Sequence, residues 1–385
     1  MSLPARSVLL RAADHDDLDA LVELENACFD GDRLSRRSFR HLLRGRHSQC
    51  LVATSEGQVV GYILLLFRRG SSLARVYSLA TAPAWRGSGI GRQLLQAAES
   101  VARERRCLFV RLEVREDNPA ALALYRAKGY KLFDTEPDYY DDGATALRLE
   151  KALAHTPPQP HQRQLFYRQS TPFTCGPASL MMAMASLDAD SCSLDTRTEI
   201  QLWREATTIF MTAGHGGCSP EGLALSAWQR GFDVTLYRQC HDIPFIEGVR
   251  DERKKQVIRL VHDDFIERIN ASEIQLQDTA ITPAQLQQHI AAGDCLITLI
   301  STWRLNRNKA PHWVFVAGCD ERFVYLNDPD PDEDGHHPFH DSIHLPVSHQ
   351  EFERMACFGS QKLKATLVLR PAGGETLADA GNIVE

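Results

Sequence analysis

The stretch Arg86-Gly87-Ser88-Gly89-Ile90-Gly91 follows a strand-like run at residues 76–80 and leads into a predicted amphipathic helix over residues 89–105. Glycines at these positions let successive backbone N–H groups point into one concavity at a helix N-terminus, where a pyrophosphate can bind. The stretch is not a Walker loop, and it lacks the Gly-x-Gly-x-x-Gly spacing of dinucleotide folds. It therefore predicts a phosphate-binding strand–loop–helix unit, with a plain tight turn as the alternative.

The elements around this loop alternate between strand and helix. The pattern predicts a helix over residues 14–26, strands over 50–53 and 59–67 joined at Glu56-Gly57, a strand over 108–114, and a helix over 119–128 that ends at Gly129. This order indicates an α/β layer sandwich.

The clearest boundary in the chain is Ala154-His155-Thr156-Pro157-Pro158-Gln159-Pro160. Three prolines among polar residues continue neither a strand nor a helix, so the segment is typical of a linker. We expect a first domain over residues 1–153, a linker over 154–162, a second domain over 163–371 and a flexible tail over 372–385.

Beyond the linker, predicted helices come first and predicted strands follow. The helices are expected at residues 175–187, 196–212, 220–230, 251–269 and 283–292, and the strands at 295–300, 312–319, 323–327 and 363–369. Segregation of this kind indicates an α+β domain.

Length and composition narrow the class of protein. A chain of 385 residues is too long for a single hydrophobic core, because such cores stop growing at roughly 250 to 300 residues, so two domains are expected. The formal net charge is −7, and basic residues are scattered among acids, so nucleic acid is not an expected partner. The sequence shows neither a signal peptide nor a stretch that could span a membrane, which predicts a cytoplasmic protein without a membrane partner. The ten cysteines include no Cys-x-x-Cys pair, which argues against a zinc ribbon and a disulfide scaffold.

Further motifs follow the glycine-rich loop. Leu112-Glu113-Val114-Arg115 precedes Asn118-Pro119-Ala120-Ala121-Leu122-Ala123-Leu124-Tyr125, and Lys128-Gly129-Tyr130 comes next. With the loop at residues 86–91, these motifs resemble the GNAT superfamily of N-acetyltransferases, and within it the RimI-like enzymes that acetylate protein N-termini. The resemblance extends over residues 8–151.

This resemblance implies acetyl-CoA as co-substrate and assigns several roles. Glu113 would be the base, acting directly or through water, and Tyr125 would be the acid toward the CoA sulfur. The alternative roles are a solvated acid at a strand end for Glu113 and a core aromatic for Tyr125. The residues implied in cofactor binding are Leu79, Ala80, Arg86, Gly87, Ser88, Gly89, Ile90, Gly91 and Asn118.

The same resemblance places the acceptor near Cys28-Phe29, the arginine-rich run at residues 33–39, and the pair Tyr139-Tyr140. The expected acceptor is a peptide or protein α-amine. A small-molecule amine is the alternative, and an acidic acceptor pocket would be its sign. The arginine run also fits an exposed helix face.

A second set of residues indicates a cysteine nucleophile. Cys175-Gly176 begins an apolar helix, and the positive end of the helix dipole favours a thiolate there. His312 opens one predicted strand and Asp328 follows the next, so an antiparallel pair would bring both to the same edge. Gln169 and the Cys175 N–H could donate to an oxyanion.

These residues resemble the papain-like C39 peptidases: Gln-x5-Cys-Gly, then His312-Trp313-Val314-Phe315-Val316, then Asp328-Pro329, over residues 163–370. The resemblance implies a Cys-His-Asp triad and a peptide substrate. A catalytically inactive, peptide-binding relative is the alternative.

Two further patterns are not predicted to form sites. Asp330 to Asp341 imitates a calcium loop without flanking helices, and the neighbouring histidines at 336, 337, 340 and 344 fit a solvated loop, so no metal is expected. Gly214-His215-Gly216-Gly217 is a candidate border of the peptidase cleft. No oligomeric state is predicted.

Overall fold

The computed structural model describes residues 7–153, 165–207, 216–240, 242–330 and 342–373. The chain separates into two units between Thr156 and Pro157, and each is considered by itself. The predicted linker and most of the predicted tail lie outside the described residues. None of the described helices combines the length and the apolar character needed to cross a bilayer.

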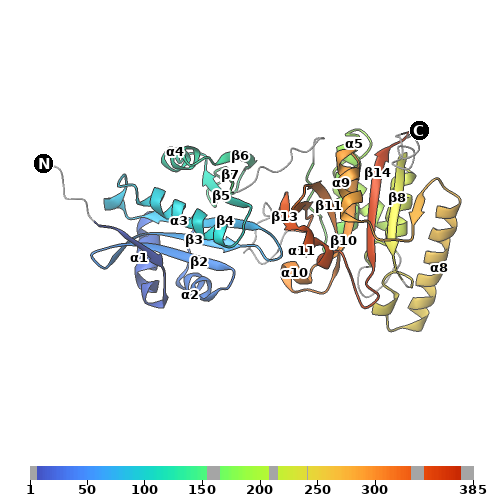
Figure 1. The fold of residues 1–385 in the computed structure, drawn as a ribbon, viewed down its shortest axis with the longest axis horizontal. Coiled ribbons are helices and arrows are strands. Elements are labelled where there is room, and N and C mark those ends of the chain that lie inside the picture. Colours follow the sequence, from blue (N-terminus) through green and yellow to red (C-terminus); the bar gives the residue numbers. More distant parts are fainter. Residues whose placement is uncertain (1–6, 154–164, 208–215, 241, 331–341, 374–385) are drawn as a thin grey trace. The chain divides into compact units, whose positions relative to one another are not determined.

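The first unit is built on a sheet with the strand order β1-β2-β3-β4-β5-β7-β6 (Figure 1). Neighbouring strands run antiparallel, except that β4 and β5 run parallel. The predicted turn at Glu56-Gly57 is confirmed, and both residues have the positive φ of a two-residue hairpin turn, 51° and 80°. The strands are β1 (Leu9–Ala12), β2 (Ser48–Ser55), β3 (Gln58–Phe67), β4 (Leu73–Thr81), β5 (Phe109–Arg115), β6 (Lys131–Glu136) and β7 (Ala146–Ala152).

Helices cover both faces of this sheet (Figure 1). Alternation along β3 separates the two cores: Tyr62 and Leu64 pack toward α1 and α2, whereas Ile63 and Leu65 pack toward α3 and α4. The α/β layer sandwich is thereby confirmed. The helical elements are η1 (His15–Asp17), α1 (Leu18–Cys28), α2 (Arg36–Arg44), η2 (Pro83–Trp85), α3 (Ile90–Glu104) and α4 (Pro119–Ala127).

The centre of this sheet is split. β4 and β5 pair only between residues 73–76 and 109–112. Against β3, β4 carries one extra residue, Tyr77, between Val76 and Ser78. A bulge of this kind bends its strand and changes where the following side chains point. Beyond it, the end of β4 turns to the α3 side, where Gly91 lies against the side chains of Thr81 and Leu124.

The second unit contains a sheet with the order β13-β12-β11-β10-β14-β8-β9, antiparallel throughout except for β8 and β9. The strands are β8 (Phe232–Gln239), β9 (Gln275–Gln277), β10 (Cys295–Ser301), β11 (Pro311–Cys319), β12 (Phe323–Asn327), β13 (Leu345–Ser348) and β14 (Lys364–Pro371). The α+β class is confirmed, but β8 and β9 interrupt the helical half that the sequence predicted. They occur there because both pair with the far edge of the sheet, beyond β14.

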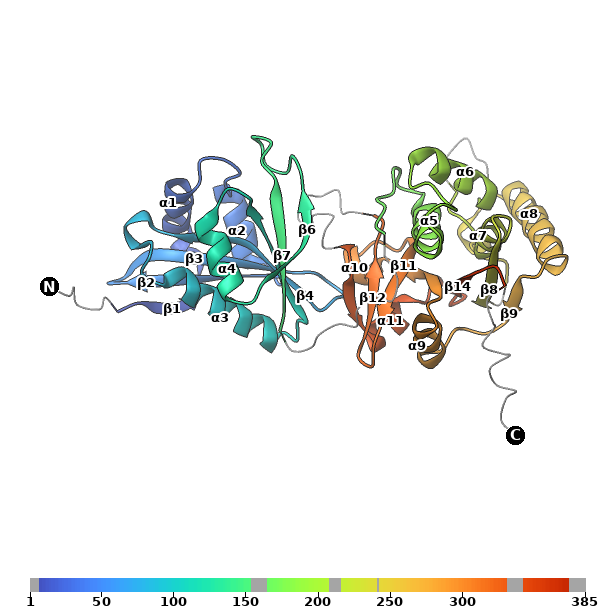
Figure 2. The same cartoon turned by 90° about the horizontal axis from the view of Figure 1, so that it is seen from above.

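Helices α5 and α7 pack on one face of this sheet, while α9 and α11 lie on the other (Figure 2). The helix predicted over residues 196–212 is shorter than expected. It ends at Ala206 because Thr207 is extended and bridges Cys218. The helical elements are α5 (Cys175–Leu187), α6 (Thr196–Ala206), α7 (Pro220–Trp228), η3 (Ile246–Gly248), α8 (Glu252–Asn270), α9 (Pro283–Ala291), α10 (Trp303–Asn306) and α11 (His349–Met355).

Candidate active sites

The glycine-rich loop of the first unit has the backbone that anion binding requires. Gly87 and Gly89 adopt positive φ angles of 79° and 87°, and Gly89 is the N-cap of α3. The first N–H groups of a helix have no intrahelical acceptor, so those of α3 are available to a phosphate. The Ile90 side chain is buried in the core, which leaves only its backbone for a ligand. The loop therefore fits the pyrophosphate of CoA.

Leu79 and Ala80 lie on the last part of β4, beyond the bulge at Tyr77. Leu79 packs against the α3 core and Ala80 is buried in the α1 core. Both residues therefore flank the split between β4 and β5, and their implied contact with the cofactor stays a prediction.

Glu113 is held in a buried ion pair. Arg75 donates to its Oε2 from Nε at 2.8 Å, and Nη2 lies 2.6 Å from the same oxygen. Both side chains are less than a tenth exposed, so Glu113 is not the solvated acid of the alternative reading. Arg75 also donates to the hydroxyl of Tyr139 at 3.3 Å, so Arg75 connects the predicted base Glu113 to the pair Tyr139-Tyr140. Glu113 is thus held in place by two groups of one arginine.

Tyr125 is buried on α4, with its ring centroid 5.8 Å from that of Tyr130. Burial and the nearby Glu113 carboxylate raise the pKa of Tyr125, so the phenol keeps its proton at neutral pH. A protonated phenol is what an acid for the CoA thiolate requires. Asn118 caps α4 by accepting from the Ala121 N–H at 3.0 Å, which occupies its side-chain oxygen.

The predicted acceptor region shows an acidic edge. Asp32 lies beside Asp141, and the pKa of Asp32 is raised by burial and then by the charge of Asp141. The arginine run lies mostly on an exposed face of α2, as the alternative interpretation predicted, and Arg36 pairs with Asp19. Cys28 donates to the Thr81 carbonyl at 3.4 Å and is thereby tied to the end of β4.

The sequence analysis missed Glu25, a carboxyl that is only 2% exposed. Its oxygens accept from the Leu34 N–H at 2.8 Å and from the hydroxyl of Tyr62. A signal for it was present in the sequence: Glu25 follows Leu18 and Leu21 at helical spacing, on the buried side of α1. An acid in a core position of a helix points to a specific partner.

In the second unit the three predicted catalytic residues come together. His312 Nε2 lies 2.6 Å from Asp328 Oδ1, and the other side of the ring interacts with Cys175. Cys175 is the first residue of α5, a helix whose buried residues run from Cys175 to Ala185, so its backbone is firmly placed. Burial alone lowers the pKa of His312, but the Asp328 carboxylate and Cys175 raise it well above 6.5. The site therefore favours an imidazolium beside the sulfur.

Gln169, the predicted oxyanion donor, is tied to the segment that carries Asp328. Its side chain is buried, and its N–H donates to the carbonyl of Pro329, the residue after Asp328, at 2.9 Å. Among the described residues its side-chain Oε1 has no hydrogen-bond partner. A buried amide without its full set of partners is costly unless a ligand supplies the contact.

A cleft of about 530 Å³ opens beside Cys175. Gly216 and Gly217 form part of its wall, as predicted, whereas Gly214 and His215 lie outside the described residues. Apolar side chains form much of the remainder: Phe245, Val249, Trp313, Phe358 and Leu363. The cleft is large enough for several residues of an extended peptide.

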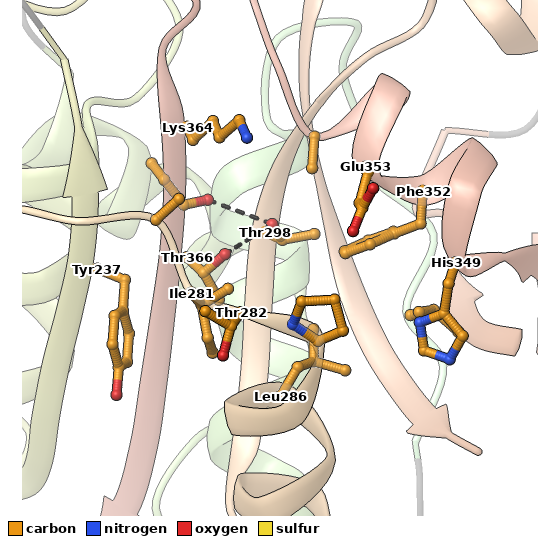
Figure 3. A pocket seen from close by; sticks show the side chains of 15 residues that line it. Tyr237, Ile281, Thr282, Leu286, Thr298, His349, Phe352, Glu353, Lys364 and Thr366 are labelled. Atoms are coloured by element: carbon orange, nitrogen blue, oxygen red, sulfur yellow. Dashed lines mark hydrogen bonds between the residues drawn. The ribbon is translucent and has the colours of Figure 1, made fainter. Parts of the chain in front are cut away.

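A smaller pocket of about 50 Å³ lies on the opposite face of the sheet, between β10, β14 and the helices α9 and α11 (Figure 3). Thr298 and Thr366 meet at its floor, with their hydroxyls 2.9 Å apart. None of the predicted catalytic residues lines it, so it is not the peptidase site. No described residues form a group of three or more potential metal ligands, and most of the calcium-like stretch, residues 331–341, lies outside the described part.

Comparison with known proteins matches each unit to a family. Residues 165–370 match the Peptidase_C39 like family, and residues 18–130 match the acetyltransferase (GNAT) family. GNAT acetyltransferases use acetyl-CoA.

Curated relatives match the first unit. The N-alpha-acetyltransferase RimI of Mycobacterium tuberculosis is 35% identical over 155 residues, which cover 39% of this chain and 96% of RimI. The N-alpha-acetyltransferase daf-31 of Caenorhabditis elegans is 29% identical over 38% of this chain and 82% of its own. The structure of the Escherichia coli ribosomal-protein-S18-alanine N-acetyltransferase matches with a TM-score of 0.36 and 21% identity, covering 42% of this chain and all of that one. The chain therefore belongs to the Peptidase_C39 like family through its second unit and to the RimI-like GNAT N-acetyltransferases through its first.

Proposed function

We propose that this protein is a bifunctional enzyme that acetylates the α-amine of a peptide or protein with acetyl-CoA and cleaves a peptide bond with Cys175. The observation that carries the second activity is the buried pair of His312 and Asp328, 2.6 Å apart, beside the thiol that begins α5. Burying a carboxylate and an imidazole together costs desolvation energy, and a catalytically inactive peptidase fold does not require that pair at the edge of an open cleft.

For peptide cleavage, the Cys175 thiolate attacks the carbonyl carbon, and the negative charge moves to the carbonyl oxygen. The Cys175 N–H and the Gln169 side-chain amide are the proposed donors to that oxygen. His312 gives its proton to the leaving amine, which leaves an acyl-thioester. A water molecule then loses a proton to His312 and releases the acid, and Asp328 holds the ring in one tautomer throughout.

For acetylation, acetyl-CoA supplies an activated acyl group. The glycine-rich loop and the N-terminus of α3 hold its phosphates, and the split between β4 and β5 gives access to the thioester. The free amine attacks the acyl carbon, and Tyr125 protonates the departing sulfur. The amine must first lose a proton, and Glu113, the predicted base, forms an ion pair with Arg75.

One observation supports a peptide α-amine as the acceptor, and a second fits either a peptide or a small-molecule amine. The relatives that match the first unit are named N-alpha-acetyltransferases. The acidic edge formed by Asp32 and Asp141 would attract an ammonium, in a basic peptide or in a small polyamine. The same edge is the reason to keep a small-molecule amine as the second candidate.

The proposal is tested by mass spectrometry of peptides incubated with the full chain and acetyl-CoA. The wild type should add one acetyl group to an α-amine and shorten some peptides, Cys175→Ala should acetylate without cleaving, and Tyr125→Phe should cleave while acetylating slowly. Cys192→Ala is the matched control, because Cys192 is equally buried but does not line the cleft. Acetylation of spermidine in place of peptides would favour the small-molecule acceptor, and cleavage of no peptide would favour a peptide-binding module.

A further inference from the structure

A chain of hydrogen bonds crosses the first unit from the β4 bulge to Glu25. Ser78 directly follows the bulged residue and is partly exposed. Its Oγ lies 2.6 Å from the hydroxyl of Tyr62, and that hydroxyl donates to Glu25 Oε2. Tyr62 is fully buried and Glu25 almost so. The three side chains come from β4, β3 and α1, so only the fold brings them together.

The position of Ser78 connects this chain to the reaction. Ser78 lies past the point where β4 and β5 stop pairing, on the α1 side of the sheet. Arg75 and Glu113 point to the same side as Ser78. The residues that flank each of them along β4 and β5 pack into the α3 core, so their own side chains point away from it. The partly exposed end of the chain thus lies at the split, where the proposed function places the acceptor amine and the acyl group.

The directions of these hydrogen bonds follow from which groups hold protons. Burial and the neighbouring Glu25 carboxyl raise the pKa of Tyr62, so its hydroxyl stays protonated. Its one proton goes to the Glu25 carboxylate, so Ser78 donates its proton to the Tyr62 oxygen. The lone pairs of the Ser78 hydroxyl can then accept a proton from a group bound at the split between β4 and β5.

We propose that Ser78, Tyr62 and Glu25 form a proton relay that deprotonates the acceptor ammonium. Ser78 takes a proton from the ammonium and passes its own to Tyr62, and Tyr62 passes its own to Glu25. One N–H bond of the ammonium and the O–H bonds of Ser78 and Tyr62 break, and new O–H bonds form on Ser78, Tyr62 and Glu25. The carboxylate becomes a carboxylic acid, and the ammonium becomes a neutral amine. Ser78 is the catalytic residue of the relay, and Tyr62 and Glu25 act through it.

The surroundings of Glu25 suit a group that must both accept and release a proton. Burial raises the pKa of Glu25, which brings it nearer to neutrality. The Tyr62 hydroxyl, the Leu34 N–H and the more distant Arg33 charge oppose this effect in part. On α1 itself Cys28 is the other titratable neighbour. Glu113, by contrast, has a cationic partner, because Arg75 Nη2 lies 2.6 Å from its carboxylate oxygen.

The kinetic test uses the full chain, acetyl-CoA and a peptide that begins with alanine. Ser78→Ala, Tyr62→Phe and Glu25→Gln should each lower kcat by about 10²-fold or more, the usual contribution of acid–base catalysis. The KM for acetyl-CoA should not change. In mixtures of light and heavy water, the wild-type rate should depend on deuterium content along a curve, because several protons move, and Tyr62→Phe should make the dependence linear.

A matched control exists in the same unit. Glu99 is also buried and lies beside Tyr130, on the other face of the sheet. Glu99→Gln should destabilise the fold but leave kcat and its isotope dependence unchanged. If Tyr62→Phe and Ser78→Ala behave like this control, the three residues serve only stability and the relay is wrong.

The relay rests on acetyl transfer by the first unit, but a second measurement separates it from the choice of acceptor. Infrared difference spectra of the wild type and Glu25→Gln should show a buried carboxyl that takes up a proton at a higher pH than an exposed glutamate does, because burial raises the pKa of Glu25. Absence of that signal overturns the relay whichever amine is acetylated. Presence of the signal with no peptide acetylated refutes the peptide acceptor alone and retains the relay.

Discussion

Replacement of Asp328 by asparagine should abolish the reactivity of Cys175 near neutral pH. The His312 ring is only 5% exposed, and burial by itself lowers its pKa. The Asp328 carboxylate, 2.6 Å away, is a principal cause of the upward shift. Unit charges about 4 Å apart at an effective dielectric of about 20 interact by about 4 kcal/mol. At 1.4 kcal/mol per tenfold, the imidazolium–thiolate pair should become about 10³-fold less populated.

The assay is the rate at which iodoacetamide alkylates Cys175 in the full chain, followed by peptide mass spectrometry from about pH 5 to pH 8. In the wild type, the raised pKa of His312 keeps the imidazolium protonated, so fast alkylation should persist through neutral pH. Asp328→Asn should alkylate about 10³-fold more slowly there. Peptide cleavage should fall at least as far, since the same change in a serine-protease triad lowers kcat by about 10⁴.

A second buried histidine–aspartate pair provides the control. His289 Nδ1 lies 2.6 Å from Asp294 Oδ2, in the same unit and away from the cleft that Cys175 lines. Asp294→Asn should leave the alkylation rate unchanged while lowering the melting temperature. Equal alkylation of wild type and Asp328→Asn, or equal slowing by both substitutions, would refute the assignment of Asp328 to the nucleophile.

Three further outcomes are expected. Arg75→Met should lower the free energy of unfolding by about 3 to 5 kcal/mol in urea titrations, because Glu113 loses its buried partner; adding Glu113→Leu should recover much of that loss. Burial raises the pKa of Glu25 in the folded state. The contribution of Glu25 to stability is therefore fully present below about pH 4.5 and is lost as the pH rises through the raised pKa. The melting temperature of Glu25→Gln, measured relative to wild type, should therefore increase from about pH 4 to pH 7, and a constant difference would contradict the shift. Gly222→Ala would place a Cβ 2.6 Å from backbone atoms of Ala206, so calorimetry should show the second unit destabilised by about 1 to 3 kcal/mol or more; an unchanged transition would refute the close packing of α6 and α7.

Local chemistry made the elements of the first unit predictable. Glycines at 87 and 89, a proline at 119 and a glycine at 129 mark where helices begin and end, and the structure places α3 and α4 at those points. Strand β8 was missed because its pattern follows a helix among other helices, and its partner β14 lies over a hundred residues further along the chain. The alternation of Phe232, Val234 and Leu236 was a local signal for this strand, but its place in the sheet has none.

The candidate sites divide in the same way. Cys175, His312 and Asp328 could be predicted because each lies at the end of an element, and antiparallel strands necessarily bring such ends to one edge. Glu113 was identified by its place after a strand, but its ion pair with Arg75 depends on the parallel pairing of β4 and β5. The carboxyl of Glu25 was not identified at all.

The sequence by itself determined two units, their fold classes and most of the candidate site residues, because glycine conformations, helix ends and alternating apolar residues act over a few positions. Only the tertiary structure decided which groups surround these residues and the buried Glu25. Glu113 is tied to Arg75, His312 is buried against Asp328, and Glu25 reaches the β4 bulge through Tyr62. Each of these contacts joins segments that are far apart in the sequence. In the low-dielectric interior, burial and the nearest charge set the proton affinity of a group, and local sequence spacing encodes neither its burial nor its nearest charge.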